Sequence, residues 1–281
     1  MSEPSAETLQ QAAGTAAPQV VNDVRPEPVG PRAPRRPIAG NTATRVLKLI
    51  ALVFMCCDHV GIRIFPGVTE LRIIGRMAFP IYAWCLVVGF NYTRSVPKYA
   101  LRLLAFGALS QPIYATAMNH DWLELNIFFE LLIGLLGLWA IRQRWHGSHV
   151  WGPVAAMILA QLLCGTVSYG WKGVLFIFLL YAVQDRRAAI WALMVAFCLF
   201  WGANSSTVTV AFGIHLATLT RNAPWTSLLS PWCRLQAMAI LAAPFILLKF
   251  PKDIRLPYWV SYMLYPGHLV ILWVVLNLLG K

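Results

Sequence analysis

Long apolar runs separated by short polar connections occupy most of the chain. A helix needs about 20 predominantly apolar residues to cross the hydrocarbon core of a bilayer. From Val46 onward the runs have this length or come close to it. The pattern predicts an all-α fold, a polytopic membrane helical bundle of about ten transmembrane helices. The expected spans are 46–65, 73–92, 99–118, 124–141, 150–168, 171–184, 188–203, 206–220, 233–250 and 258–279, of which the sixth to eighth are short.

The first 44 residues do not follow this pattern. They are rich in proline, with alanine, acidic residues, glutamine and arginine between the prolines and no hydrophobic periodicity. Such a segment cannot bury enough apolar surface to offset the entropy cost of ordering it. The sequence therefore predicts a disordered cytoplasmic tail over 1–44 and a transmembrane domain over 45–281.

Composition supports a membrane protein. The chain has 281 residues, of which 58% are hydrophobic and 12% charged, and its mean hydropathy is +0.61. Soluble domains have about 45–50% apolar and about 25% charged residues. These values exclude a disordered chain, a coiled coil and a disulfide-stapled secreted domain. The six cysteines include no C-x-x-C pair, so we interpret them as small buried side chains and expect no metal site.

The net charge of +12 is explained by topology. Most basic residues lie between apolar runs, where they keep short loops in the cytoplasm, so we expect no direct binding of nucleic acid. They follow the even-numbered spans, which predicts that both termini are cytoplasmic. The basic group after the ninth span, Lys249, Lys252 and Arg255, breaks this rule. Either these charges are functional, or one short segment within 171–220 does not cross the membrane.

Asp58 and His59 are ionisable residues inside the first span. Such residues are costly in a membrane and mark functional sites by default. Consecutive residues point about 100° apart on a helix, so Asp58 and His59 need separate partners. Lys48 lies three turns before His59 on the same face, about 16 Å away. The alternative is a pair at a helix end that is solvated by lipid headgroups.

Two arginines share a helix face at the start of the second span. Arg72 and Arg76 are spaced i, i+4, and Pro80 removes the hydrogen bond that the Arg76 carbonyl would have accepted. Guanidinium groups bind phosphates and carboxylates in a bidentate manner, so this pair favours an anion. Alternatively, Arg72 is an interfacial anchor and only Arg76 is buried.

Further polar residues fall within later spans. Asn126 and Glu130 share one face of the fourth span, where Glu130 must be paired or protonated. Tyr265 and His268 share a face of the last span and are expected to point into one cavity. His215 stands alone among apolar residues, and we interpret it as a core histidine.

In this order, the motifs resemble those of the TraX-like conjugal transfer proteins, a family that includes the TrbP proteins of broad-host-range plasmids. The resemblance covers most of residues 46–281. It rests on Leu47–Ala51 leading into Asp58-His59-Val60-Gly61, on Leu71–Arg76 with Phe79-Pro80-Ile81, on Leu125–Phe129, on Ser168-Tyr169-Gly170, and on Tyr265–Leu269.

This resemblance implies a multi-pass protein of the bacterial inner membrane, with a cytoplasmic N-terminus, that acetylates the N-terminal amine of a pilin subunit with acetyl-CoA. The family is also distantly similar to membrane acyltransferases that O-acylate glycans, in which a basic residue and a histidine about eleven positions apart lie on the first helix. Lys48 and His59 match that spacing, with lysine in place of the usual arginine.

The expected roles follow from this resemblance and from the intramembrane positions. His59 is the expected general base, assisted by Asp58 and His268 as catalytic residues. The residues expected to bind substrate or CoA are Lys48, Arg72, Arg76, Asn126, Tyr169 and Tyr265. The expected partners are a pilin subunit or another conjugation component and the lipid bilayer. The alternatives are a non-catalytic scaffold, a small-anion transporter, or an O-acyltransferase that acts on a glycan.

Overall fold

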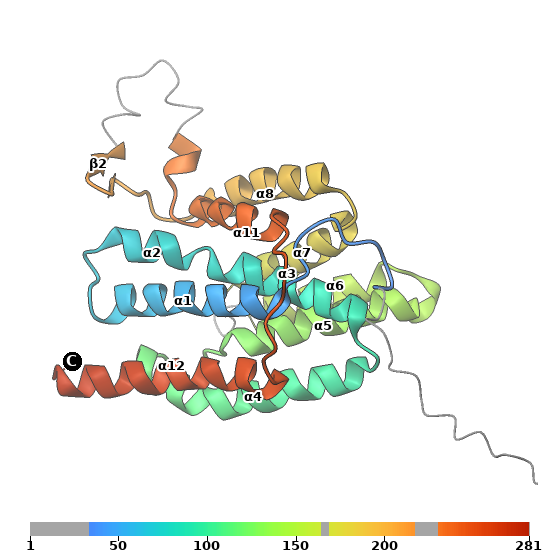
Figure 1. The fold of residues 1–281 in the computed structure, drawn as a ribbon, viewed down its shortest axis with the longest axis horizontal. Helices are drawn as coiled ribbons and strands as arrows, with labels where there is room; N and C mark the ends of the chain where they lie inside the picture. Colours follow the sequence, from blue (N-terminus) through green and yellow to red (C-terminus); the bar gives the residue numbers. More distant parts are fainter. Residues whose placement is uncertain (1–33, 164–168, 217–229, 281) are drawn as a thin grey trace, which may run out of the picture. The chain divides into compact units, whose positions relative to one another are not determined.

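The computed structural model describes residues 34–163, 169–216 and 230–280, which form one predominantly helical unit (Figure 1). Residues 1–33 of the expected tail and the ends of the fifth and eighth expected spans lie outside the described residues. The α-helices are α1 (Thr44–Arg63), α2 (Thr69–Gly75), α3 (Ala78–Tyr92), α4 (Val96–Met118), α5 (Ile127–Gln143), α6 (Trp151–Leu162), α7 (Gly170–Val183), α8 (Arg187–Gly202), α11 (Ala243–Leu247) and α12 (Tyr258–Leu278). The 3-10 helices are η2 (Trp145–Gly147), η3 (Ser230–Cys233) and η4 (Gln236–Ala242).

The described helices run back and forth between two ends of the bundle. α2 and α3 together make one pass, as do η4 and α11, so the described residues make nine passes that start at Thr44 and end at Leu278. α3 is the central helix, and almost every residue from Ala78 to Asn91 is buried. Its large side chains Phe79, Trp84 and Phe90 are among the most deeply buried in the molecule. The all-α prediction is confirmed apart from one small hairpin.

The eighth expected span, 206–220, is wrong over its described part. Residues 210–215 form an antiparallel hairpin of β1 (Val210–Ala211) and β2 (Ile214–His215). Its two turn residues, Phe212 and Gly213, have φ angles of 51° and 74°, as in a type I′ turn. His215 is exposed on this hairpin rather than buried in the core. The β-branched and apolar residues of this segment give it the hydropathy of a membrane helix. The positive φ angles of Phe212 and Gly213 are incompatible with a continuous α-helix.

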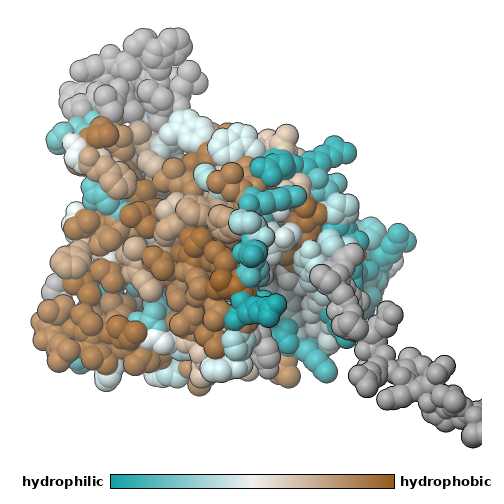
Figure 2. All heavy atoms as spheres, viewed as in Figure 1, coloured by the Kyte–Doolittle hydropathy of each residue, from teal (hydrophilic) through white to brown (hydrophobic). Residues whose placement is uncertain are grey.

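Because residues 206–216 are not part of a membrane span, the basic group Lys249, Lys252 and Arg255 no longer breaks the topology rule. With one crossing fewer, the connection from α11 to α12 lies at the same end as the other basic loops (Figure 1). The Lys and Arg residues of this basic end are Arg35, Arg36, Arg45, Arg94, Lys98, Arg142, Arg144, Arg186, Arg187, Lys249, Lys252 and Arg255. Figure 2 shows hydrophilic residues gathered toward this end and hydrophobic residues over most of the remaining visible face. The second of the two explanations for the basic group therefore fits the fold. Nine passes also place the end of α12 opposite the start of α1, so the prediction that both termini lie on one side is wrong.

Two helical stretches in the described residues have the length and hydropathy of a membrane span, Thr69–Tyr92 and Trp259–Leu278. Four shorter helical stretches are also apolar: Trp151–Leu162, Gly170–Val183, Arg187–Gly202 and Gln236–Leu247. Large apolar side chains on α6 and α12 point outward, including Leu162, Ile271 and Leu278. Such exposed apolar faces suit contact with lipid.

Residues 34–43, which the sequence assigned to the tail, pack against the basic end of the bundle. The Ala39 amide donates to the Gln184 carbonyl at 2.8 Å, and the Asn41 amide donates to the Ile246 carbonyl at 2.7 Å. The Asn41 side chain is completely buried. The segment leads directly into α1 and fixes where that helix begins.

Candidate functional site

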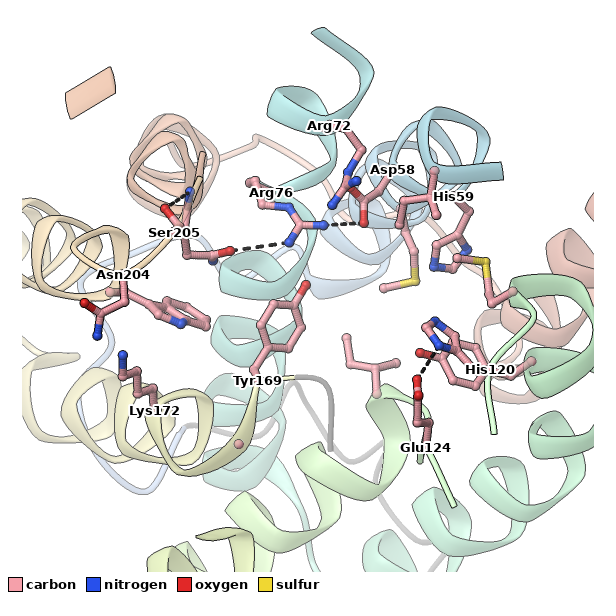
Figure 3. Close-up of a pocket in the computed structure, with 18 of the residues that line it drawn as sticks. Asp58, His59, Arg72, Arg76, His120, Glu124, Tyr169, Lys172, Asn204 and Ser205 are labelled. Carbon is pink, nitrogen blue, oxygen red and sulfur yellow. Dashed lines mark hydrogen bonds and ion pairs between the residues drawn. The ribbon is translucent and has the colours of Figure 1, made fainter. Parts of the chain in front are cut away.

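A cavity of about 700 Å³ lies at the end of the bundle opposite the basic loops. It is within the size range of ligand pockets, about 300–1,000 Å³. Figure 3 shows polar side chains from α1, α2, α7 and the connections after α4 and α8 pointing into it. Its polar and aromatic lining residues are Asp58, His59, Arg72, Arg76, Tyr114, His120, Glu124, Tyr169, Trp171, Lys172, Trp201, Asn204, Ser205, Gln236 and Tyr265.

Asp58 is the partner of both arginines. Arg72 Nε donates to Asp58 Oδ1 at 3.0 Å, and Arg76 Nη2 donates to Asp58 Oδ2. The Asp58 and Arg76 side chains are 11% and 13% exposed, while Arg72 is 31% exposed. The two arginines thus share one face, as the i, i+4 spacing predicts, but one carboxylate already joins them. One excess positive charge remains, and Arg76 Nε has no hydrogen-bond partner among the described residues.

A glycine allows α1 and α2 to approach closely enough for this cluster. A Cβ atom on Gly75 would lie 2.7 Å from Asp58 Cγ, closer than real Cβ contacts allow. The helix is interrupted at Arg76 and Met77, which lie between α2 and α3 and precede Pro80. This break places Arg76 at the junction of two helices, where its Nη1 also donates to Gln236 Oε1 at 3.4 Å.

His59 pairs with His268 across a sequence separation of 209 residues. His59 Nδ1 lies 3.0 Å from His268 Nε2, and the two rings stack with their centroids 5.1 Å apart. One nitrogen must donate and the other accept, so the two tautomers are coupled. Because Nδ1 is engaged, Nε2 is the His59 nitrogen that remains for a ligand. Asp58 and His59 thus have separate partners, as their helical angle predicts.

Tyr169 lies at the centre of the cavity, with its hydroxyl directed toward the arginine cluster (Figure 3). Its ring packs against Phe79 and Trp201 at centroid distances of 4.2 and 5.3 Å. The buried Glu130 accepts a hydrogen bond from the Tyr169 amide through Oε2 at 3.2 Å. Glu130, whose partner the sequence left open, therefore holds the start of α7 in place.

Asn126 is fully buried and acts as the N-cap of α5. Its Oδ1 accepts from the Phe128 amide at 3.1 Å, and its Nδ2 donates to Gln111 Oε1 at 2.9 Å and to the Gly107 carbonyl at 2.8 Å. These bonds occupy the side chain, which does not reach the cavity. Asn126 fixes the start of α5, where Ile127 forms part of the cavity wall.

Lys48 lies in a second, smaller cavity of about 30 Å³. Its Nζ is 5.5 Å from the centroid of the Tyr262 ring. The spacing of three helical turns places Lys48 and His59 on one face, but too far apart to share a cavity. Tyr265 lines both cavities.

The comparisons with known proteins identify the family. Residues 43–276 match the protein family described as TraX protein. The chain belongs to the TraX family. This family membership confirms the resemblance that the spaced motifs indicate.

Three proteins illustrate what this chain is similar to. A protein named TraX from Escherichia coli is 33% identical over 187 residues, which cover 62% of this chain and 72% of that protein. A probable fimbrial assembly protein FimC, serogroup H1, from Dichelobacter nodosus is 28% identical over 165 residues, covering 53% and 66%. The uncharacterized protein RP591 from Rickettsia prowazekii is 28% identical over 145 residues, covering 50% and 56%. The chain thus spans less than two thirds of the last two relatives. No solved structure matches it.

In this TraX-family chain the cavity also contains residues that sequence reasoning did not select. His120 and Glu124 form an ion pair at the mouth, and the His120 ring stacks on Tyr114 at 5.4 Å. Lys172 contributes a cation to the cavity, and Gln236 contacts Arg76. These residues lie in connections or at helix ends, where hydropathy gives no signal. The fold brings them together around the cavity, at the end opposite the basic loops.

Proposed function

We propose that this protein is a membrane acetyltransferase that transfers an acetyl group from acetyl-CoA to the amine of a pilin subunit. The observation that carries the proposal is that His59, paired with His268, lines a polar cavity beside two arginines. A general base next to cationic groups suits attack on a thioester. Membership of the TraX family and similarity to a protein named for fimbrial assembly support a role in pilus maturation.

In the proposed reaction one proton is transferred twice, first from the amine to His59 and then from His59 to the CoA thiolate. The amine nitrogen attacks the thioester carbonyl carbon and forms the new C–N bond, and its proton passes to His59 Nε2. The C–S bond then breaks, and the CoA thiolate leaves with its electron pair. The same proton returns from His59 to the thiolate, so the histidine is neutral again and the products are the amide and CoA.

His268 is the positioning residue for this base. For His59 Nε2 to accept a proton, His59 Nδ1 must carry a hydrogen and donate it to His268 Nε2, which lies 3.0 Å away. The stacked arrangement of the two rings also fixes the direction in which Nε2 points. Removing His268 would allow the wrong tautomer and a mobile ring, so the rate falls even though the base remains.

Arg76 and Arg72 supply positive charge where the carbonyl oxygen becomes negative. Arg76 Nε has no partner among the described atoms, and Asp58 holds both guanidinium groups in fixed positions. A fixed donor stabilises a developing oxyanion without having to reorganise. Lys172, which lies on the other side of Tyr169 from His59 (Figure 3), suits the phosphates of CoA.

The test is the intact mass of the cognate pilin from cells with the wild-type protein, with no protein, and with His59→Ala. We expect a mass increase of one acetyl group that requires both the protein and His59. His149→Ala is the matched control, because His149 is an exposed histidine in the loop between α5 and α6 at the basic end. An unchanged pilin mass in all strains would contradict the proposal and favour a glycan acceptor, a transporter or a scaffold.

A further inference from the structure

The two cavities share one wall. Ile127 and Tyr265 line both the cavity of about 700 Å³ and the cavity of about 30 Å³. The smaller one holds little more than water. The smaller cavity is therefore too small in this conformation to hold more than about one water molecule, and Ile127 and Tyr265 separate it from the larger cavity.

The smaller cavity is mainly apolar and aromatic. Lys48 and Ser261 are the two residues in its lining that are neither apolar nor aromatic. The remaining residues that line it, besides the shared wall, are Tyr82, Leu86, Tyr99, Leu103, Phe128, Leu131 and Tyr262. An alkyl chain is the kind of group such a lining would accept.

Tyr265 is fixed in its position. It is 4% exposed, and its ring meets Phe128 edge to face at a centroid distance of 4.9 Å. The His268 ring lies 5.2 Å away and pairs with His59. The wall is thus next to the histidine pair that we assign to the chemical step.

The charges of the large cavity orient a bound acyl-CoA. Its cations, Arg72, Arg76 and Lys172, line the part of the cavity formed by α2 and α7. The phosphates of the donor belong with Lys172, on the other side of Tyr169 from His59 (Figure 3), because Arg72 and Arg76 are joined to Asp58 beside His59. With the thioester carbon at His59, the apolar end of the acyl group is directed toward Tyr265 and Ile127.

We propose that Tyr265, together with Ile127, limits the length of the acyl group that this protein transfers. Acetyl fits before the wall, whereas a longer chain must enter the smaller cavity and is stopped by the Tyr265 ring. This inference rests on the proposed function and adds its donor specificity. The bonds made and broken are those of acetyl transfer, and only the number of methylene groups changes.

The experiment compares acetyl-, butyryl- and hexanoyl-CoA as donors for the purified protein in lipid vesicles. Tyr265→Leu and Ile127→Ala open the wall from its two sides. One methylene changes kcat/KM by about 10–200-fold in a fitted pocket. We expect both variants to raise the butyryl-to-acetyl ratio of kcat/KM by about tenfold or more.

Two matched controls separate the wall from its surroundings. Tyr265→Phe keeps the ring, and Leu103→Ala enlarges the smaller cavity without opening the wall, so both should retain the wild-type ratio. An unchanged ratio in both wall variants would overturn the inference. Loss of all transfer in both, with an unchanged Tm, would also overturn it, since the wall would then serve to hold the histidines.

A binding measurement distinguishes failure of this inference from failure of the proposed function. If the wild-type protein transfers no acyl group from any donor, the proposed function is wrong. Binding of S-hexyl-CoA, a non-reactive thioether, still tests the wall, because Ile127→Ala should bind it more tightly than the wild-type protein does. Equal binding by the two proteins would reject the acyl-length limit on its own.

Discussion

Asp58→Asn tests the energetic role of the buried carboxylate that joins the two arginines. The change preserves the shape of the side chain but removes its charge. Arg76, which is 13% exposed, is left without its ionic partner. Breaking a buried ion pair from one side costs about 3–5 kcal/mol. Arg72 is 31% exposed and more readily solvated, so the lower value applies, about 3 kcal/mol.

The assay is thermal unfolding of the purified protein in detergent. A loss of about 3 kcal/mol corresponds to a decrease in Tm of about 6–12 °C for a chain of this size. The double variant Asp58→Asn with Arg76→Gln should recover part of the loss, because it no longer leaves that charge buried and unpaired.

Glu124→Gln is the matched control for this prediction. Its ion pair with His120 also lines the cavity, but the two side chains are 38% and 33% exposed. Exposed pairs contribute about 0–1 kcal/mol. A decrease in Tm for Asp58→Asn no larger than that for Glu124→Gln would refute the assignment of Asp58 as the buried link between α1 and α2.

Three other changes give further tests. Gly75→Ala adds a methyl group 2.7 Å from the Asp58 carboxyl carbon, so we expect a loss of about 1–3 kcal/mol in the free energy of unfolding; an unchanged Tm would show that the helices separate without cost. Glu130→Gln keeps an acceptor for the amide that precedes α7, whereas Glu130→Leu removes it and should cost about 1–3 kcal/mol; equal decreases in Tm would contradict the capping role. In a cysteine-free background, cysteines at Asn204 and Arg186 should react with an impermeant maleimide from opposite sides of sealed vesicles, since they lie at opposite ends of α8; labelling from one side would contradict a membrane crossing by α8.

The sequence predicted local relations well. The angle between consecutive helical residues correctly gave Asp58 and His59 separate partners. The i, i+4 spacing correctly placed Arg72 and Arg76 on one face. These relations depend only on helix geometry. What the arginines bind was not predictable, because Asp58 reaches them from another helix and a residue spacing says nothing about which helices pack together.

Hydropathy predicted the wrong secondary structure where an apolar segment adopts a backbone conformation that is not helical. The run over 206–216 is apolar enough for a span, but Gly213 and its neighbour turn the chain into a hairpin. Lys48 fits the spacing from His59, yet it lies in another cavity because three helical turns separate the two side chains. Asn126 illustrates another limit of sequence reasoning. A polar residue at the start of a helix can be either an N-cap or a ligand-binding residue, and only its hydrogen-bond partners in the folded protein distinguish the two.

The His59–His268 pair has a consequence for the order of biosynthesis. The two residues are 209 positions apart, and α1 is made long before α12. Until α12 docks, His59 has no partner ring and the cavity lacks the Tyr265 wall. Contacts between distant segments form late, after their loop-closure entropy has been overcome. A nascent or truncated chain therefore carries the proposed general base but not the ring that positions it, and under the proposed function each molecule gains its activity only at the final docking step.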